Sequence, residues 1–409
     1  MAKLGLVLSG GSIRGVAHIG MLKALEEHDL LKDIEVVVGT SAGSIVASMF
    51  AVGYTPGEMW EIWDKDVWRL FGGKKSASAV EDRNWSGLLD AIIHFDPKRF
   101  RGYIKGNKLL KALQCYLTPN DPCTSIRPTG KKRPLYVLST DFNTGQETVW
   151  CFTRHVTPAD ALEGAEAEAD QFEPAPGRQA FWEVRRDDDP QIQQFPSLAE
   201  VCRCSASIPM IFVPARAPIK CTDGTTIDNL YTDGGVRDNY SLSTAVKLAG
   251  CDRVIGMFLS SLVITNKPWD GLIDLQQRTM TQMGMTIFEA DQDDAQIRTT
   301  DIRTLVPYFA GQITTFDIKA MKSLYHAGHR VTKHFLKAVE AEMRKKHMTG
   351  PVTWDAIFSI TDLGSESAGA TLSPARPRAS LRSATAEEAQ PLPDVKYYIY
   401  SELPPDTQP

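Results

Sequence analysis

The sequence predicts an α/β protein with three layers, in which helices cover both faces of a mostly parallel central sheet. Two pairs of segments near the N-terminus predict this fold. Residues 3–9 and 34–38 are short apolar runs, typical of strands that are buried on both faces. Residues 16–25 and 42–52 follow them with the helical spacing of small and apolar residues. An alternation of strand and helix is typical of a parallel sheet with helices packed on it.

A third helix is expected to begin at Thr55. Thr55 and Glu58 form a capping box, and Pro56 occupies the first helical position. Aromatic residues on its apolar side are Trp60, Trp63, Trp68 and Phe71. Farther along, residues 72–134 contain many loop signals and one helical pattern near residues 108–116, so we expect a cap or lid over the sheet.

The middle of the chain contains a hairpin and a polar stretch. Residues 135–142 and 147–152 are strand-like runs joined by a short turn that contains Gly145. Residues 157–196 are rich in Glu, Asp, Pro and Gln and poor in aliphatic residues. This composition predicts an exposed polar insertion.

The alternation of helices and strands continues after the insertion. The expected elements are a helix at 197–206, a strand at 227–232, a helix at 241–249, a strand at 253–259 and long helices at 269–298 and 317–346. We therefore assign residues 1–347 to one domain. Residues 365–393 consist mainly of Ser, Ala, Pro and Arg, so the C-terminal extension, residues 348–409, is expected to be largely a disordered tail.

The composition is that of a globular protein and disfavours some function classes. The chain has 409 residues, of which 43% are hydrophobic, and a formal net charge of -5, so we expect a substantial core and no nucleic-acid partner. Neither a signal peptide nor a run of about 18 apolar residues is present, which predicts a cytoplasmic protein with at most peripheral membrane contact. The seven cysteines lack zinc-like spacing, so we expect buried free thiols and no metal or other cofactor. The oligomeric state is left open.

A glycine-rich turn, Gly10-Gly11-Ser12-Ile13-Arg14-Gly15, follows the first strand. It is similar to the GxGxxG fingerprint of dinucleotide-binding proteins, but Ser12 replaces the middle glycine. The acid at a suitable spacing, Glu35, lies at the start of the second strand and not at its end, where a ribose would be bound. We therefore interpret the N–H groups of Gly10, Gly11 and Ser12 as donors to a tetrahedral oxyanion.

A second glycine-framed turn, Gly39-Thr40-Ser41-Ala42-Gly43, follows the second strand. It fits the GxSxG pattern of a nucleophile elbow, in which a serine lies at a strand-to-helix junction. Gly39 and Gly43 are small enough for the tight turn, and the helix that begins there directs its positive end toward a developing anion. Ser41 is therefore predicted to be the nucleophile of an acyl hydrolase.

A serine nucleophile needs a base, and the histidines of this chain are poorly located for that role. None of the four considered lies in a loop at the end of a strand: His155, His326, His329 and His334. Asp233, by contrast, ends a predicted strand. The two glycines that follow it leave space for its carboxylate to approach another turn.

Three motifs together resemble the patatin-like phospholipase family. They are GGSIRG at residues 10–15, GTSAGS at residues 39–44 and Asp233-Gly234-Gly235, in this order. Residues 205–209 and Asn239 are also similar to the family pattern, and the resemblance spans roughly residues 4–340. It implies a patatin-like fold and a lipid ester as the substrate.

The resemblance also implies roles for individual residues. In this family a Ser-Asp dyad replaces the triad, so Ser41 would be the nucleophile and Asp233 the base. The amides of residues 10–12 would form the oxyanion hole, and Arg14 matches a basic position that orients the loop or the anionic substrate. The family usually has a glycine where this chain has Ser12.

An ordinary aspartate has a pKa of about 3.9 and is a weak base at neutral pH, so Asp233 is expected to lie in a mostly dry pocket. With that environment, the expected function is a lipid acyl hydrolase that cleaves carboxylic esters of phospholipids or related lipids without a metal. Two alternatives remain open: a hydrolase of lysophospholipids, acylglycerols or thioesters, and a catalytically silent lipid-binding or regulatory protein on the same fold. The aromatic residues at 60–71, with Lys74 and Lys75 after them, are compatible with a membrane contact, but we favour core packing of the aromatic side chains. We likewise favour core packing of Met280 and Met285 over an acyl-chain channel.

Overall fold

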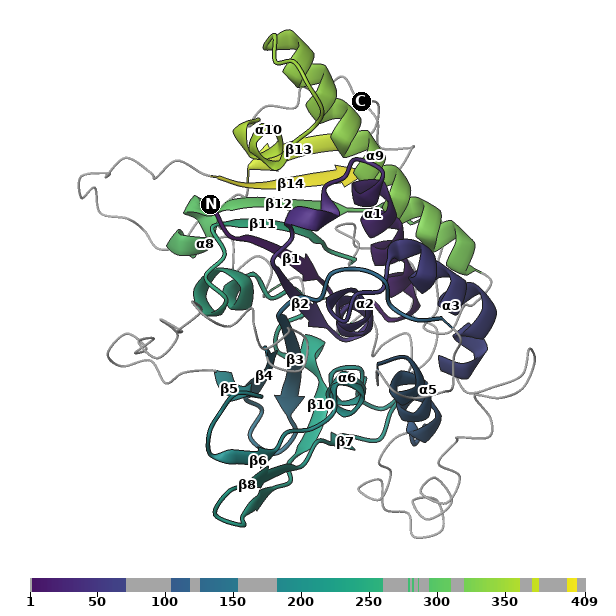
Figure 1. The fold of residues 1–409 in the computed structure, drawn as a ribbon, viewed down its shortest axis with the longest axis vertical. Helices are drawn as coiled ribbons and strands as arrows, with labels where there is room; N and C mark the ends of the chain where they lie inside the picture. The colour runs from purple at the N-terminus through teal and green to yellow at the C-terminus, as the bar shows by residue number, and fades with distance from the viewer. Residues whose placement is uncertain are drawn as a thin grey trace.

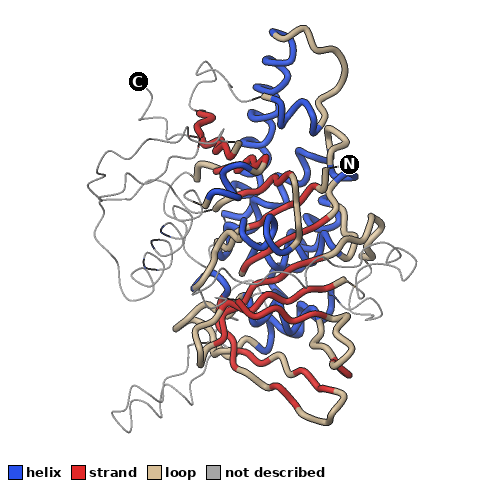
Figure 2. The backbone as a smooth tube through the Cα atoms, turned by 90° about the vertical axis from the view of Figure 1, so that its left-hand side faces the viewer, coloured by secondary structure: helices blue, strands red, loops and turns tan. Residues whose placement is uncertain are grey.

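One large sheet runs along the longest axis of the molecule, and its strands follow one another down that axis in two views (Figure 1 and Figure 2). The computed structural model of the chain describes residues 2–70, 104–117, 126–153, 182–259, 294–309, 320–360, 370–374 and 396–402, and the single residues 279, 282 and 286. The described residues form an 11-stranded main sheet and a separate sheet of three strands.

The central strands of the main sheet are parallel, as predicted. Their order is β14-β12-β11-β1-β2-β3. Their bounds are β1 (Leu4–Leu8), β2 (Val36–Thr40), β3 (Leu135–Asp141), β11 (Arg253–Met257), β12 (Asp301–Val306) and β14 (Tyr397–Glu402). Every residue of β1 and β2 is buried because helices cover both faces, and this explains why both strands are continuous apolar runs.

Antiparallel strands extend the sheet beyond this centre. β13 (Ala370–Pro374) pairs with β14, β4 (Glu147–Phe152) pairs with β3 as the predicted hairpin, and β10 (Leu230–Asp233) pairs with both β3 and β7 (Ala215–Arg216). The small sheet consists of β6 (Ile192–Gln194), β8 (Ile219–Cys221) and β9 (Thr226–Ile227).

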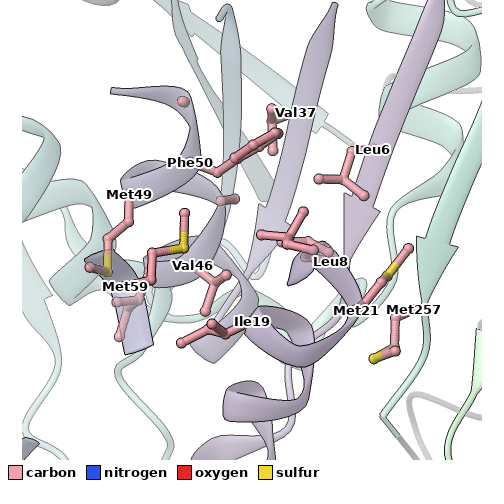
Figure 3. Close-up of a cluster of buried hydrophobic side chains, with 14 of the residues drawn as sticks. Leu6, Leu8, Ile19, Met21, Val37, Val46, Met49, Phe50, Met59 and Met257 are labelled. Carbon is pink, nitrogen blue, oxygen red and sulfur yellow. The ribbon is translucent and has the colours of Figure 1, made fainter. Parts of the chain in front are cut away.

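Two hydrophobic clusters cover the two faces of the sheet, which confirms the three layers. On one face, Leu6, Leu8 and Val37 of the strands pack with the helices, as Figure 3 shows for Ile19 and Val46. The helices of this layer are α1 (Val16–Glu26), α2 (Ala42–Ala51), α3 (Pro56–Leu70), α5 (Asn107–Leu117), α6 (Leu198–Ser205), α9 (Met321–Lys345) and α10 (Trp354–Ser359). On the other face, the alternate strand residues pack against the π-helix η8 (Thr244–Leu248) and α8 (Ala295–Thr299).

Most predicted elements are present, with shifted ends. The capping box of α3 is formed, since Thr55 N donates to Glu58 Oε2 at 2.8 Å and Glu58 N donates to Thr55 Oγ1 at 3.3 Å. The second strand begins at Val36 rather than at residue 34, because Ile34 N closes a turn on the carbonyl of Leu31. The strand predicted at 227–232 is divided between β9 and β10.

Part of the predicted polar insertion is a strand of the sheet. Of residues 157–196, those up to 181 lie outside the described residues. β5 (Trp182–Arg186) pairs in parallel with β4, and the carboxylate of Asp187 accepts a hydrogen bond from Thr153 N at 2.9 Å. The expectation of an exposed insertion is therefore wrong for residues 183–187, which are partly or fully buried, because backbone pairing compensates for their few aliphatic side chains.

The C-terminal part also contributes to the main sheet. β14 pairs with β12, so the domain boundary expected at residue 347 does not hold for residues 396–402. Arg303 connects β12 with the C-terminal part of the chain. Its guanidinium donates to the carbonyls of Lys396 at 3.1 Å, Phe358 at 2.9 Å and Ile360 at 3.1 Å. The sequence signal is the run YYIYSE, whose aromatic and β-branched residues favour a strand. Residues 361–369 and 375–395 lie outside the described residues.

Several other expectations are tested only in part. Within the predicted cap or lid, residues 72–103 and 118–125 lie outside the described residues, while α5 buries Leu109 and Leu113 in the hydrophobic core. Trp63 is buried in the same core, as expected, and Trp60 packs on the ring of Tyr325 with the centroids 4.4 Å apart. The side chains of Trp68, Phe71, Met280 and Met285 are not among those described. No helix in the described ranges is both long and apolar enough to span a membrane.

Candidate active site

Ser41 occupies the tight turn between β2 and α2. Its backbone has φ 54° and ψ -124°, a conformation that residues with a side chain rarely adopt. Two close contacts require the flanking glycines: a Cβ atom at Gly43 would lie 2.2 Å from the carbonyl oxygen of Leu8, and one at Gly39 would lie 2.6 Å from Cβ of Ala47. The turn therefore has the geometry of a nucleophile elbow.

Asp233 reaches Ser41 because β2 and β10 pair with the same edge of β3. β4 pairs with the other edge along residues 135–140. β2 pairs with the first part of β3, where Thr40 lies opposite Leu138, and β10 pairs in the reverse direction with the next part, where Asp233 lies opposite Ser139. The C-terminal ends of β2 and β10 consequently meet.

The side chains of Ser41 and Asp233 form a hydrogen bond where these strand ends meet. Ser41 Oγ donates a hydrogen bond to Asp233 Oδ2 over 2.6 Å. The other carboxylate oxygen, Oδ1, accepts a hydrogen bond from Gly235 N at 2.8 Å, and the Asp233 carbonyl accepts one from Thr140 Oγ1 at 3.0 Å. Two hydrogen bonds thus hold the carboxylate, and a third holds the backbone of Asp233.

The surroundings of Asp233 make it a stronger base than an ordinary aspartate. Only 2% of Asp233 is exposed, and burial raises its pKa to about 7, although the hydrogen bonds from Ser41 and Gly235 N act in the opposite direction. A carboxylate with this pKa can accept a proton from a hydroxyl at neutral pH more readily than an exposed aspartate.

Gly10 lies against Ser41, but its N–H is already paired. Gly10 N donates to the carbonyl of Asn239 at 3.0 Å, so the prediction that this amide is free to bind an oxyanion is wrong for this structure. Its lack of a side chain leaves room for Asn239 and Ser41. A Cβ atom at Gly10 would lie 2.3 Å from Asn239 Oδ1 and 3.0 Å from Cβ of Ser41.

The next residues of the glycine-rich turn form the 3-10 turn η1 (Ser12–Gly15). The carbonyl of Gly11 accepts hydrogen bonds from Arg14 N at 3.1 Å and from Arg14 Nε at 3.2 Å. The side chain of Arg14 therefore holds its own loop, which is one of the two roles implied for it, and burial lowers its pKa. Ser12 has φ 57°, which explains why glycine is usual at this position. Oxyanion binding by Gly11 and Ser12 stays a prediction.

Sequence reasoning missed residues that contact this pair. Ser205 Oγ accepts a hydrogen bond from Ser41 N at 2.8 Å, and the carbonyl of Ser207 accepts one from Asp233 N at 2.9 Å. Both serines lie in residues 205–209, which the family resemblance had singled out without a role.

The histidines considered earlier have other surroundings. His326 and His334 are exposed, His329 pairs with Glu27 at 3.1 Å, and His155 lies outside the described residues. His18, which was not considered, is fully buried beneath the glycine-rich turn, and its Nε2 donates to the carbonyl of Ser9 at 2.8 Å. Burial lowers its pKa to about 4.

The described part of the chain contains no group of three or more His, Cys, Asp or Glu side chains arranged to hold a metal ion. The expectation of a metal-independent site stays a prediction. The described cysteines are all free, and five of them are buried: Cys115, Cys151, Cys202, Cys204 and Cys251.

Two comparisons with curated proteins match short segments. The chain is 37% identical over 87 residues to the lysophospholipase NTE1 of Phaeosphaeria nodorum, which is 21% of this chain and 5% of that protein. It is 49% identical over 51 residues to the lysophospholipase NTE1 of Eremothecium gossypii, which is 12% of this chain and 3% of that protein. The chain thus spans only a small part of these relatives.

Among solved structures, VipD from Legionella pneumophila matches with 14% identity and a TM-score of 0.38, over 81% of this chain and 67% of that one. The family model for patatin-like phospholipases matches residues 6–246, which is more than half of the chain and includes Ser41 and Asp233. The chain belongs to the patatin-like phospholipase family.

Proposed function

We propose that this protein is a lipid acyl hydrolase that cleaves carboxylic esters with Ser41 as the nucleophile and Asp233 as the general base. The observation that carries the proposal is the hydrogen bond of 2.6 Å from Ser41 Oγ to Asp233 Oδ2. The strained elbow at Ser41 and the raised pKa of Asp233 support the same assignment.

In the acylation step, Asp233 accepts the proton of Ser41 Oγ while Oγ attacks the ester carbonyl carbon. The carbonyl oxygen becomes negatively charged, and we assign its stabilisation to the N–H groups of Gly11 and Ser12 and to the N-terminus of α2. The bond to the leaving alcohol then breaks, and Asp233 returns the proton to that alcohol. The products are the free alcohol and an ester between the acyl group and Ser41.

In the deacylation step, a water molecule attacks the acyl carbon and gives its proton to Asp233. The bond between the acyl carbon and Ser41 Oγ breaks, and Asp233 protonates Oγ. The fatty acid leaves, and both residues return to their starting states. The same carboxylate therefore acts twice as a base and twice as an acid.

We propose a lysophospholipid as the first substrate to test, because the curated relatives matched by this chain are named lysophospholipases. Diacyl phospholipids, acylglycerols and thioesters are the competing substrates of the same chemistry. Since such substrates reside in micelles or bilayers, the proposal includes peripheral contact with a lipid surface.

The test compares wild type, Ser41→Ala and Asp233→Asn with lysophosphatidylcholine, diacyl phosphatidylcholine, monoacylglycerol and an acyl thioester, measuring fatty acid release. Ser41→Ala should abolish release. Asp233→Asn should lower it by about 100-fold or more, since general base catalysis typically contributes that much. Asp228→Asn, an exposed carboxylate, is the matched control and should retain full activity. Full activity of folded Ser41→Ala would refute the proposal.

The catalytically silent alternative is tested by a fluorophosphonate probe, which reacts with activated serines. Labelling of wild type and not of Ser41→Ala supports the enzyme. Absence of labelling at Ser41 in folded wild type, together with binding of lipid, would support a lipid-binding role.

A further inference from the structure

The end of α6 contacts both members of the Ser41–Asp233 pair. Ser205, the last residue of α6, bonds to the backbone of Ser41, and Ser207, two residues later, bonds to the backbone of Asp233. These contacts connect three segments that are far apart in the sequence. They make the end of α6 a common support for the nucleophile and the base.

On the nucleophile side, the contact is made by a side chain. Ser205 Oγ accepts the hydrogen bond from Ser41 N at 2.8 Å, and Ser205 is fully buried. Ser41 precedes the first residue of α2, so its N–H has no acceptor within that helix. Removing the hydroxyl of Ser205 would leave a buried donor unpaired at Ser41, whose backbone has a positive φ.

On the acid side, the contact is made by a carbonyl. The oxygen of Ser207 accepts hydrogen bonds from Asp233 N and from Thr232 Oγ1, each at 2.9 Å. Ser207 is itself anchored to α6, because its Oγ donates to the carbonyl of Arg203 at 2.8 Å and accepts from Arg203 Nη1. The position of Asp233 therefore depends on the loop that follows α6.

The guanidinium of Arg203 holds that loop in place. It is 3% exposed and donates to the carbonyls of Val213 at 2.9 Å, Lys105 at 3.0 Å and Gly106 at 3.2 Å. It also lies over the ring of Phe212, with 4.9 Å from Cζ to the centroid. The loop at residues 207–213 is thus tied to α6 at both ends.

α6 is in turn fixed against α2. Cys202 Sγ lies 2.9 Å from Ser48 Oγ, one helical turn before Ser205, and both side chains are fully buried. The two contacts lie on one face of α6, because residues three apart share a face of a helix. Ser48 hydrogen-bonds neither Ser41 nor Asp233, so it provides a comparison for Ser205.

We propose that Ser205 is a positioning residue for acyl transfer: its hydroxyl holds the backbone of Ser41 so that Oγ stays within hydrogen-bond distance of Asp233. This proposal rests on the proposed function of the Ser41–Asp233 pair. Ser205 touches neither the substrate nor the reacting oxygen. Its effect on the reaction passes through the main chain of Ser41.

The proposal predicts a specific kinetic signature for Ser205→Ala. Because a buried group left unpaired costs about 1–3 kcal/mol, kcat and the rate of fluorophosphonate labelling should both fall by about 5- to 160-fold. KM should not change, since no substrate contact is lost. The hydrogen bond from Ser41 lowers the pKa of Asp233, so its weakening should move the midpoint of the activity profile to higher pH.

The experiment uses the full chain and measures kcat, KM, labelling rate, pH profile and thermal unfolding for wild type, Ser205→Ala, Ser205→Cys and Ser48→Ala. Ser205→Cys keeps a weak acceptor of similar size and should fall between wild type and Ser205→Ala. Ser48→Ala removes an equally buried hydroxyl from the same helix contact and should keep kcat and the pH midpoint of wild type. If Ser205→Ala does not fold, the Cys variant carries the comparison.

The outcomes separate this proposal from the proposed function. If wild type is labelled at Ser41 but Ser205→Ala keeps kcat within about twofold, the positioning role is refuted and the function stands. Equal loss of kcat in Ser48→Ala would also refute it, since the effect would then be one of general stability. If folded wild type is neither active nor labelled, the proposed function fails, and the positioning role fails with it.

Discussion

Ser41 and Asp233 are joined because the strands that carry them share one edge of β3 and end against each other. Thr40, the residue before Ser41, lies opposite Leu138, and Asp233 lies opposite the next residue, Ser139. The hydrogen bond of 2.6 Å between the two side chains thus follows from the pairing of backbone strands, and does not depend on a flexible loop. A site built in this way holds its reacting groups closely.

Activity should increase with pH through about pH 7. Asp233 must be deprotonated to accept the proton of Ser41, and burial raises its pKa to about 7. We therefore expect kcat/KM for a neutral water-soluble ester to rise between about pH 6 and pH 8 and to level off above that range. The measurement is kcat/KM from pH 5 to pH 9. A flat profile over this range would contradict the role of Asp233 as the base.

Asp233 should also lower the stability of the folded protein at high pH. Its folded pKa, about 7, lies above the ordinary value of about 3.9, so the stability that it contributes is complete below pH 3.9 and is lost as the pH rises through 7. Asp233→Asn removes this dependence. Relative to wild type, the variant should gain about 3 kcal/mol in the free energy of unfolding between pH 5 and pH 8.

Urea unfolding of both proteins at pH 5 and pH 8 measures this difference. Asp228→Asn is the control, because Asp228 is an exposed partner of Arg216 and lies outside the site. Its difference from wild type should be the same at both pH values. An equal difference for Asp233→Asn at both values would show that burial does not raise the pKa of Asp233.

Ser12→Gly should stabilise the glycine-rich turn relative to Ser12→Ala. Ser12 has φ 57°, which costs a residue with a Cβ atom about 1 kcal/mol and costs glycine little. Because Gly and Ala both lack the hydroxyl, the comparison isolates the backbone conformation. Thermal unfolding should give the Gly variant the greater stability by about 1 kcal/mol. A more stable Ala variant would mean that the turn does not need a left-handed residue.

The local parts of the site could be predicted from the sequence because they depend on neighbouring residues. Gly39 and Gly43 around Ser41 define the elbow, and the strand and helix that flank it follow from the apolar pattern. Asp233 is a candidate because it ends a strand before two glycines, and the family resemblance gives it the role of the base. The sequence therefore predicts both residues of the pair.

The other features of the site depend on contacts between segments that are far apart in the sequence. The residue pattern within one segment cannot predict such contacts. The pairing of Gly10 N with the carbonyl of Asn239, and the bond between Ser205 and Ser41, each join residues more than 160 positions apart. β14 was missed for a related reason. It is a short strand that follows a stretch poor in apolar residues, and its place beside β12 is specified by the sheet rather than by its own neighbourhood.

His18 should make the protein less stable in mild acid. Its Nε2 donates to the carbonyl of Ser9, and burial lowers its pKa to about 4, below the ordinary value of about 6.5. The unfolded chain therefore binds a proton between pH 6.5 and pH 4 that the folded protein does not bind. Stability is complete above pH 6.5 and should fall by at most about 3 kcal/mol as the pH decreases to 4.

His18→Gln tests this expectation, because the Gln amide can donate to Ser9 but does not titrate. The variant should be less stable than wild type at pH 7.5, where packing of the imidazole is lost, and the gap should narrow toward pH 4. The exposed His326→Gln is the control and should keep a constant difference from wild type. The free energies of unfolding come from urea titrations at pH 7.5, 5.5 and 4.5. If the gap between wild type and His18→Gln stays constant over these values, the folded and unfolded chains bind the same number of protons at His18, and burial does not lower the pKa of this residue.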